Sequence, residues 1–240
     1  MDILYSKTGS HGNSSVVTDN SSIIQIDAGV SPENVNQKSN YNLCNIIGVL
    51  CTHKHQDHAK YIEKYLKLGI KVYACKDVWE HLYIACNTRN AVTIEAGKQF
   101  NVGTFIVKPF NVAHVNSDGT PCENLGFLIY STSTKEKMLW ITDASYIESR
   151  FPPMDYICIE CNYVDIEDYA NELEFVNTFV EGRRLRSHLS LDRCVEFLKQ
   201  QDLSRVKEIR LLHLTESQGD IYNIIYSRMK NEFPDIKFVF

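Results

Sequence analysis

The stretch "NIIGVLCTHKHQDH", residues 45–58, joins a continuous apolar run to a dense group of potential metal ligands. The apolar part predicts a strand that is buried on both faces. The polar part has the pattern His-x-His-x-Asp-His and supplies His53, His55, Asp57 and His58. Because open α/β sheets place their chemistry at the ends of buried strands, the stretch predicts an α/β fold with a metal site at a strand end.

The spacing within the motif favours two metal ions over one. In extended backbone His53 and His55 point to the same side, whereas Asp57 and His58 lie where the chain turns into a helix and can face a neighbouring point. Two such pairs suit two ions about 3.5–4 Å apart. A single structural zinc would use all four ligands, and structural zinc sites lean heavily on cysteine. Imidazole and carboxylate together favour zinc, manganese or iron over calcium.

Three downstream residues, each at the end of an apolar strand pattern, are candidates for completing the two sites: His114, Asp143 and His213. The carboxylate of Asp143 could bridge two ions. Each residue also has an ordinary interpretation: a lone histidine can be a hydrogen-bonded loop residue, and Asp143 could cap a helix in "ASYIES". His11 and His81 are interpreted as ordinary loop and helix residues.

Strand and helix patterns alternate along the rest of the chain, which predicts one domain, 1–240, with two βα-rich halves. Strands are expected over 2–6, 21–29, 45–52, 70–75, 98–114, 124–132, 137–143, 155–161, 206–214 and 235–240. Helices are expected over 59–69, 76–86, 164–184, 190–201 and 217–231.

Composition indicates a soluble, cytoplasmic protein. No stretch approaches the ~20 apolar residues that span a bilayer, and "MDILYSKTGS" has no signal-peptide core. The net charge of −5 argues against a general nucleic-acid-coating surface. One basic run, "EGRRLRSHLS" (181–190), precedes and includes His188; a solvated helix end is the alternative for its arginines. The eight cysteines are expected to be reduced, and the Cys158-x-x-Cys161 pair is interpreted as core packing rather than as a metal or redox site.

The motif "THKHQDHAK" (52–60), followed by His114, Asp143 and His213, resembles the metallo-β-lactamase superfamily. Four shorter motifs resemble its YycJ/WalJ-like branch, which lies close to the tRNase Z and phosphodiesterase-type hydrolases: "TGSHGNSS" (8–15), "IDAG" (26–29), "IECNYV" (159–164) and "SHLS" (187–190). The loop residue His11 and the "TDAS" sequence (142–145) depart from the usual pattern of that branch.

The resemblance implies a four-layer αβ/βα sandwich, with two facing mixed β-sheets flanked by helices. It also implies a dinuclear centre in which His53, His55 and His114 hold one ion, Asp57, His58 and His213 hold the other, and Asp143 lies between them. The retained aspartate and His188 point toward phosphodiester cleavage, with His188 holding the phosphate or protonating the leaving oxygen. Asp57 would also orient the hydroxide. Weaker substrate contacts are assigned to Arg184, Arg186, Asn162 and Asn13.

The sequence therefore predicts a hydrolase in which two divalent ions, zinc or manganese, activate a hydroxide for phosphodiester cleavage. The expected substrate is nucleic acid, cleaved in a DNA exonuclease-like manner. A small cyclic nucleotide is the enzymatic alternative, and the acidic net charge keeps it open. A catalytically silent metal-binding or interaction module is the alternative of another class, and lactam or thioester hydrolysis is more distant. The expected partners are nucleic acid or nucleotide and no membrane, with a homodimer as one option.

Overall fold

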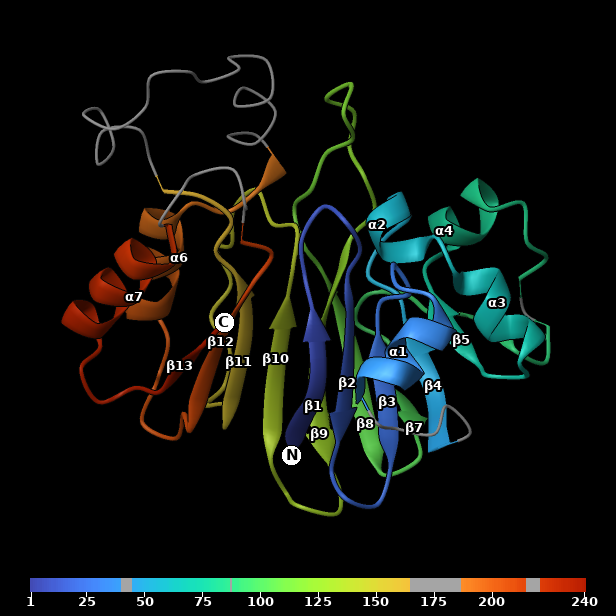
Figure 1. Cartoon of the computed structure of the whole chain (residues 1–240), viewed down its shortest axis with the longest axis horizontal. Coiled ribbons are helices and arrows are strands. Elements are labelled where there is room, and N and C mark those ends of the chain that lie inside the picture. Colours follow the sequence, from blue (N-terminus) through green and yellow to red (C-terminus); the bar gives the residue numbers. More distant parts are fainter. Residues whose placement is uncertain (40–44, 87, 165–186, 215–220) are drawn as a thin grey trace. The chain divides into compact units, whose positions relative to one another are not determined.

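The computed structural model describes residues 1–39, 45–86, 88–164, 187–214 and 221–240. They fall into two compact units, which are considered separately. The first unit contains Met1–Asn111 and Glu123–Lys137, and the second contains Val112–Cys122 and Met138–Phe240 (Figure 1). The expectation of one domain, 1–240, stays a prediction.

The first unit contains a six-stranded mixed sheet whose strands lie in chain order. Its strands are β1 (Asp2–Lys7), β2 (Ser14–Thr18), β3 (Ile23–Ile26), β4 (Ile46–Leu50), β5 (Val72–Ala74) and β6 (Ala91–Thr93). Strands β1 to β3 pair antiparallel, and β3 to β6 pair parallel. Strand β2 is buried along its whole length and β3 is buried from Ile24 to Ile26, so neither strand shows the alternation of a half-exposed strand.

The described residues of the first unit form four helices: α1 (Pro32–Ser39), α2 (Gln56–Ala59), α3 (Ile62–Lys67) and α4 (Lys76–His81). The single helix expected over 59–69 is divided in two, and the hydrogen bonds show why. The N–H of Tyr61 donates to the carbonyl of Ala28 at 2.9 Å, and the carbonyl of Asp57 accepts from the N–H of Asn13 at 2.6 Å. These tertiary bonds replace the Tyr61-to-Asp57 bond that would have continued the helix.

An antiparallel set of three strands completes the first unit: β7 (Phe100–Val102), β8 (Phe105–Asn111) and β9 (Leu125–Ser131). It packs against the first sheet through the stacked rings of Tyr73 and Phe100, whose centroids are 5.0 Å apart. The buried carboxylate of Asp19 ties the two sets of strands together, because it accepts from the hydroxyls of Thr104 (2.6 Å) and Ser131 (2.5 Å).

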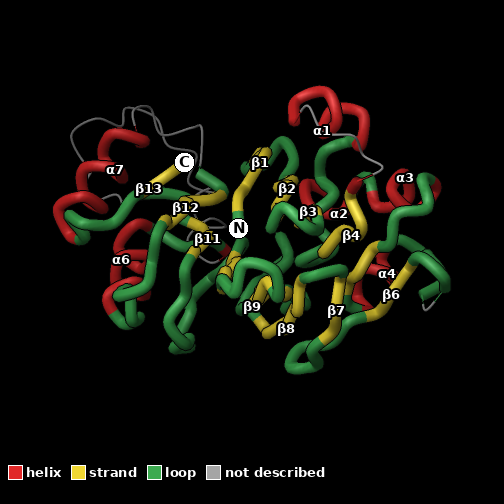
Figure 2. Tube along the Cα trace, turned by 90° about the horizontal axis from the view of Figure 1, so that it is seen from below, coloured by secondary structure: helices red, strands yellow, loops and turns green. Residues whose placement is uncertain are grey.

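The second unit is built on four parallel strands: β10 (Lys137–Ile141), β11 (Tyr156–Glu160), β12 (Glu208–Leu212) and β13 (Phe238–Val239). Helices α6 (Leu191–Lys199) and α7 (Ile221–Glu232) lie beside each other against these strands (Figure 2). Ion pairs from Arg228 to Asp192 (3.2 Å) and from Lys199 to Glu232 (2.6 Å) join the two helices. The hydroxyl of Ser190 caps the start of α6 by accepting from the N–H of Arg193.

Most of the expected elements are present. The elements α1, β2 and β6 were not expected as separate segments, and α4 ends at His81 rather than near residue 86. The helix expected over 164–184 and the start of the one expected over 217–231 lie outside the described residues. Cys158 and Cys161 are buried, and burial raises the pKa of the Cys158 thiol, as expected for core cysteines. No helix within the described ranges is long and apolar enough to cross a membrane.

Candidate metal centre

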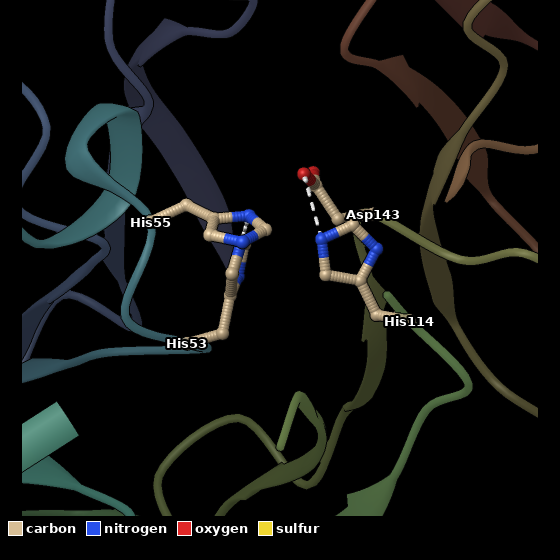
Figure 3. A group of neighbouring side chains, drawn as sticks. All are labelled: His53, His55, His114 and Asp143. Atoms are coloured by element: carbon tan, nitrogen blue, oxygen red, sulfur yellow. Dashed lines mark hydrogen bonds and ion pairs between the residues drawn. The ribbon is translucent and has the colours of Figure 1, made fainter. Parts of the chain in front are cut away.

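The His-x-His-x-Asp-His motif follows β4 in the first unit, as the sequence predicts. His55 is the N-cap residue of α2, so Asp57 and His58 lie in the first turn of that helix. His53 and His55 lie side by side (Figure 3), with Nε2 of His53 3.0 Å from Nδ1 of His55. Since metal–nitrogen bonds are about 2.0–2.1 Å long, two nitrogens that share one ion lie about 3 Å apart. The pair therefore has the geometry of two ligands to one ion.

A buried carboxylate, Asp27, fixes the orientation of His58. Its Oδ2 lies 2.8 Å from Nδ1 of His58, and its Oδ1 accepts from the N–H and the hydroxyl of Thr52, both at 2.9 Å. The hydroxyl proton of Thr52 is thus used, so the Thr52 oxygen acts as acceptor toward Nδ1 of His53, 3.0 Å away. In both imidazoles Nδ1 carries the proton and Nε2 keeps the lone pair that a metal needs.

Asn13 lies against the same pair of residues. Its side-chain nitrogen is 3.0 Å from Oδ2 of Asp57 and 2.8 Å from Nε2 of His58. Asn13 is 3% exposed, so its side chain contacts residues of the motif rather than solvent. Its predicted contact with substrate stays a prediction.

The second unit gathers its predicted ligands around Asp143. Oδ2 of Asp143 is 3.8 Å from Nε2 of His114 (Figure 3), and Oδ1 is 3.5 Å from Nδ1 of His213. One carboxylate thus faces an imidazole with each of its oxygens. The alternative that Asp143 caps a helix is wrong, because residues 144–155, all of them described, contain no helix. Nδ1 of His114 donates to the carbonyl of Ser187 at 3.1 Å, which leaves Nε2 as the coordinating nitrogen.

Glu160, at the end of β11, is a site residue for which the sequence analysis assigned no role. Its Oε1 accepts from Nδ1 of His188 at 2.6 Å and from Nδ1 of His213 at 2.9 Å. Its Oε2 accepts from the N–H groups of Ala144 (2.7 Å) and Leu189 (3.2 Å). A carboxylate that ends a run of otherwise apolar strand residues, "YICIE", is the signal that could have found it.

Glu160 is completely buried, and burial works to raise the pKa of its carboxyl. The charge of His188 and the hydrogen bonds from both imidazoles outweigh burial and hold that pKa below its usual value. Ligand atoms of Asp143, Glu160, His188 and His213 lie within 4.8 Å of one another, which raises the question of a metal site among these four residues alone. Both oxygens of Glu160 are already occupied by N–H donors, so the group is better explained as a hydrogen-bonded unit that orients two imidazoles.

His188 and Asn162 both lie next to His213. The ring centroid of His188 is 5.0 Å from that of His213 and 6.0 Å from that of His114. The side-chain nitrogen of Asn162 donates to the carbonyl of His213 at 2.6 Å and holds a backbone with a positive φ of 58°. Asn162 therefore supports a predicted ligand; its predicted substrate contact stays a prediction. Arg184 and Arg186 lie outside the described residues.

The donor set of each unit fits divalent metal ions. In four of the predicted ligands, Nδ1 faces an oxygen acceptor: Thr52 for His53, Asp27 for His58, the Ser187 carbonyl for His114 and Glu160 for His213. Imidazoles oriented in this way, together with the carboxylates of Asp57 and Asp143, are suitable ligands for divalent metal ions. The thiol of Cys51, which lies two residues before His53, donates to the carbonyl of His53 at 3.2 Å, and burial raises the pKa of this thiol well above its usual value.

The chain is similar to several known proteins. Exodeoxyribonuclease YycJ of Bacillus anthracis is 27% identical over 150 residues, which is 60% of this chain and 54% of that protein. The chain thus spans about half the length of this relative. The metallo-β-lactamase fold protein YhfI from Bacillus subtilis superposes with a TM-score of 0.66 at 13% identity, covering 97% of this chain and 94% of the other. Human tRNase Z, short form, gives a TM-score of 0.60 at 14% identity, covering 99% and 95%.

The structural likenesses confirm the expected fold class, with two mixed β-sheets flanked by helices. Residues 23–213, most of the chain, match the family described as the β-lactamase superfamily domain. That range includes the His-x-His-x-Asp-His motif and the three later ligand candidates His114, Asp143 and His213. The chain therefore belongs to the β-lactamase superfamily, and its fold is that of the metallo-β-lactamases.

Proposed function

We propose that this chain is a metal-dependent hydrolase that cleaves phosphodiester bonds in nucleic acid, in the manner of a DNA exonuclease. The observation that carries the proposal is the pairing of His188 with Glu160 at 2.6 Å, beside the predicted ligands His114 and His213. An imidazole held in this way is suited to the phosphate or the leaving oxygen of a phosphodiester. The names of the relatives, an exodeoxyribonuclease and a tRNase Z, support the same class of bond.

In this proposal seven residues hold two divalent ions, zinc or manganese: His53, His55 and His114 for one ion, Asp57, His58 and His213 for the other, and Asp143 for both. When bound, such ions lower the pKa of a water from ~15.7 toward ~7 and polarise a phosphoryl oxygen. In His53, His58, His114 and His213, Nδ1 donates to an oxygen acceptor, so the Nε2 lone pairs of these four imidazoles need no rearrangement before binding.

The protein's own groups then position the reactants and move one proton. Asp57 orients the attacking water as well as coordinating. His188 donates from Nε2 to a phosphate oxygen, or gives that proton to the departing oxygen, while Glu160 stabilises the positive charge of the ring through Nδ1–H. Arg184, Arg186, Asn162 and Asn13 stay as proposed substrate contacts, and a cytoplasmic location stays a proposal.

The first test is cleavage of bis-p-nitrophenyl phosphate with Mn²⁺ or Zn²⁺ by the wild-type chain and by Asp57→Ala and His55→Ala. Both variants should lose turnover while keeping the wild-type circular dichroism spectrum, because each removes a ligand without removing buried apolar surface. Near-normal turnover in either variant would disprove the catalytic assignment. A wild-type chain that binds two ions yet cleaves no phosphodiester would instead favour the silent metal-binding module.

A cyclic nucleotide is the second candidate substrate, favoured by the net charge of −5, which weakens attraction to a polyanion. End-labelled DNA tested beside a panel of cyclic nucleotides separates the two. Shortening of the DNA from one end supports the leading proposal, and turnover of the cyclic nucleotides alone overturns its nucleic-acid part.

A further inference from the structure

Three segments of the first unit meet at the second half of the metal motif: the loop Gly9–Asn13, the turn Asp27–Gly29 and the helix start Asp57–His58. The N–H of Asn13 donates to the carbonyl of Asp57 at 2.6 Å, and the N–H of Gly29 donates to the carbonyl of Asn13 at 2.9 Å. The backbone of Asn13 is therefore held from both sides, between the motif and the turn that carries Asp27.

The close approach of these segments leaves no room for adjustment. A Cβ on Gly29 would lie 1.6 Å from the carbonyl oxygen of Asp57 and 2.6 Å from the nitrogen of Asn13, so only glycine fits there. Gly12, with a φ of +128°, adopts a conformation that side chains rarely allow, and its Cβ would lie 2.5 Å from the Gly29 carbonyl oxygen. The position of Asn13 relative to Asp57 is thus set by the backbone.

The orientation of the Asn13 amide is also determined. Its Oδ1 accepts from the N–H of Gly9 at 2.8 Å, so the nitrogen end must face the motif. There Nδ2 lies 3.0 Å from Oδ2 of Asp57 and 2.8 Å from Nε2 of His58. The Nε2 lone pair serves either the amide or a metal ion, so an ion that takes it leaves Asp57 as the acceptor for the amide.

We propose that Asn13 is a positioning residue for one of the two ions, the one assigned to Asp57 and His58. Its amide holds one oxygen of Asp57 by hydrogen bonding and thereby aims the carboxylate. The inference rests on the proposed function for the assignment of that ion. His53, by contrast, is oriented by Thr52, so the other ion does not depend on Asn13 in the same way. Asn13 therefore supports the binding of the ion assigned to Asp57 and His58, and not the binding of the ion assigned to His53.

The test is metal titration of the full chain with Mn²⁺ and with Zn²⁺, by calorimetry and by metal analysis after gel filtration. Wild type should bind two ions. Asn13→Ala should bind one ion with wild-type affinity and the second about 10–100-fold more weakly, as is typical when a group that orients a ligand is removed. Asn13→Ser should give the same selective loss. The serine hydroxyl is too short to accept from the N–H of Gly9 and donate to the carboxylate of Asp57 at the same time.

Thr18→Ala is the matched control. Thr18 lies at the other end of β2, is 4% exposed, and ties its own turn by donating to the carbonyl of Ser22 (3.1 Å) and accepting from the N–H of Asn20 (3.0 Å). It should keep both metal affinities at wild-type values. Thermal unfolding of each variant in EDTA identifies a temperature at which all of them are folded, and the titrations are carried out at that temperature.

Wild-type affinity for both ions in Asn13→Ala, equal weakening of both ions, or the same loss in Thr18→Ala would overturn the inference. The outcome is separable from that of the proposed function. If wild type binds two ions and Asn13→Ala loses one selectively, the inference holds even where no phosphodiester is cleaved. A wild-type chain that binds fewer than two ions overturns both.

Discussion

The two units orient their histidines with the same device, a buried carboxylate at a strand end, but they use it differently. Asp27 receives one imidazole, from His58, and satisfies its other oxygen with Thr52. Glu160 receives two imidazoles, from His188 and His213, on a single oxygen. The first carboxylate supports one proposed metal ligand. The second joins a proposed metal ligand to the group proposed to move the proton, so binding and chemistry depend on the same residue.

Glu160→Gln should be the most damaging way to break this comparison. The glutamine amide must turn its N–H₂ either toward two imidazole N–H groups or toward two backbone N–H groups, so donors face donors in a buried place. Turnover of bis-p-nitrophenyl phosphate should fall about 10²–10⁴-fold, the contribution typical of general acid–base catalysis. Metal affinity should fall in parallel, since His213 loses its acceptor.

His188→Ala is the matched control for that experiment. It should lose comparable turnover with both ions still bound, because it removes the proton donor and spares His213. If Glu160→Gln kept wild-type metal affinity, the hydrogen bond from His213 to Glu160 would not contribute to metal binding. If His188→Ala lost an ion, His188 would be a ligand and its proposed role would be wrong.

Asp27→Asn should have a narrower effect. The amide would either oppose the Nδ1–H of His58 or force the proton onto Nε2, the nitrogen needed for coordination. We expect about 10–100-fold weaker binding of one ion, with the other unchanged, in the same calorimetric titration. Turnover restored by saturating metal would separate this variant from Glu160→Gln. Equal weakening of both ions would contradict the division into two half-sites.

Asp19 sharpens the comparison, because it is a buried carboxylate that holds no imidazole. Burial works to raise its pKa, but hydrogen bonds from Ser131, Thr104 and the N–H groups of Ser22 and Ser21 outweigh burial and lower it. A lowered native pKa means that the stabilisation is present above the unfolded value, about 3.9, and is lost as pH falls through the native value.

Asp19→Asn should therefore destabilise the fold by about 1–3 kcal/mol near neutral pH and by less at acidic pH, with metal binding intact. Urea unfolding in the presence of EDTA, repeated over a pH series, measures the difference. A destabilisation that is the same at every pH would show that the charge of Asp19 is not what stabilises the fold.

What the sequence reveals depends on how far apart the interacting residues are. His53, His55, Asp57 and His58 are contiguous, so their shared purpose can be recognised directly. The strands that end near His114, Asp143 and His213 were predicted for the same reason: each is a local apolar run. Short segments such as β6 carry too few residues for any period to be visible.

The residues that orient the ligands could not be found in that way. Asp27 contacts His58 across 31 positions, Asn13 contacts Asp57 across 44, and Glu160 contacts His213 across 53. The divided helix after the motif has the same cause, since Tyr61 bonds to Ala28 rather than along its own helix. In each case a tertiary hydrogen bond overrides the local preference, and one sequence carries no direct record of it.

Three residues of the candidate metal centre, Asp27, Asp143 and His213, have left-handed backbone conformations, with φ values of 63°, 52° and 58°. Aspartate and histidine tolerate this conformation better than most residues, yet glycine adopts it with no steric cost. Selection for thermal stability alone would therefore tend to favour glycine at these positions, which removes two proposed ligands, Asp143 and His213, and the residue that orients a third, His58. Directed evolution of this chain should therefore select for metal binding and thermal stability together. Selection for stability alone would yield a more stable protein that no longer binds metal.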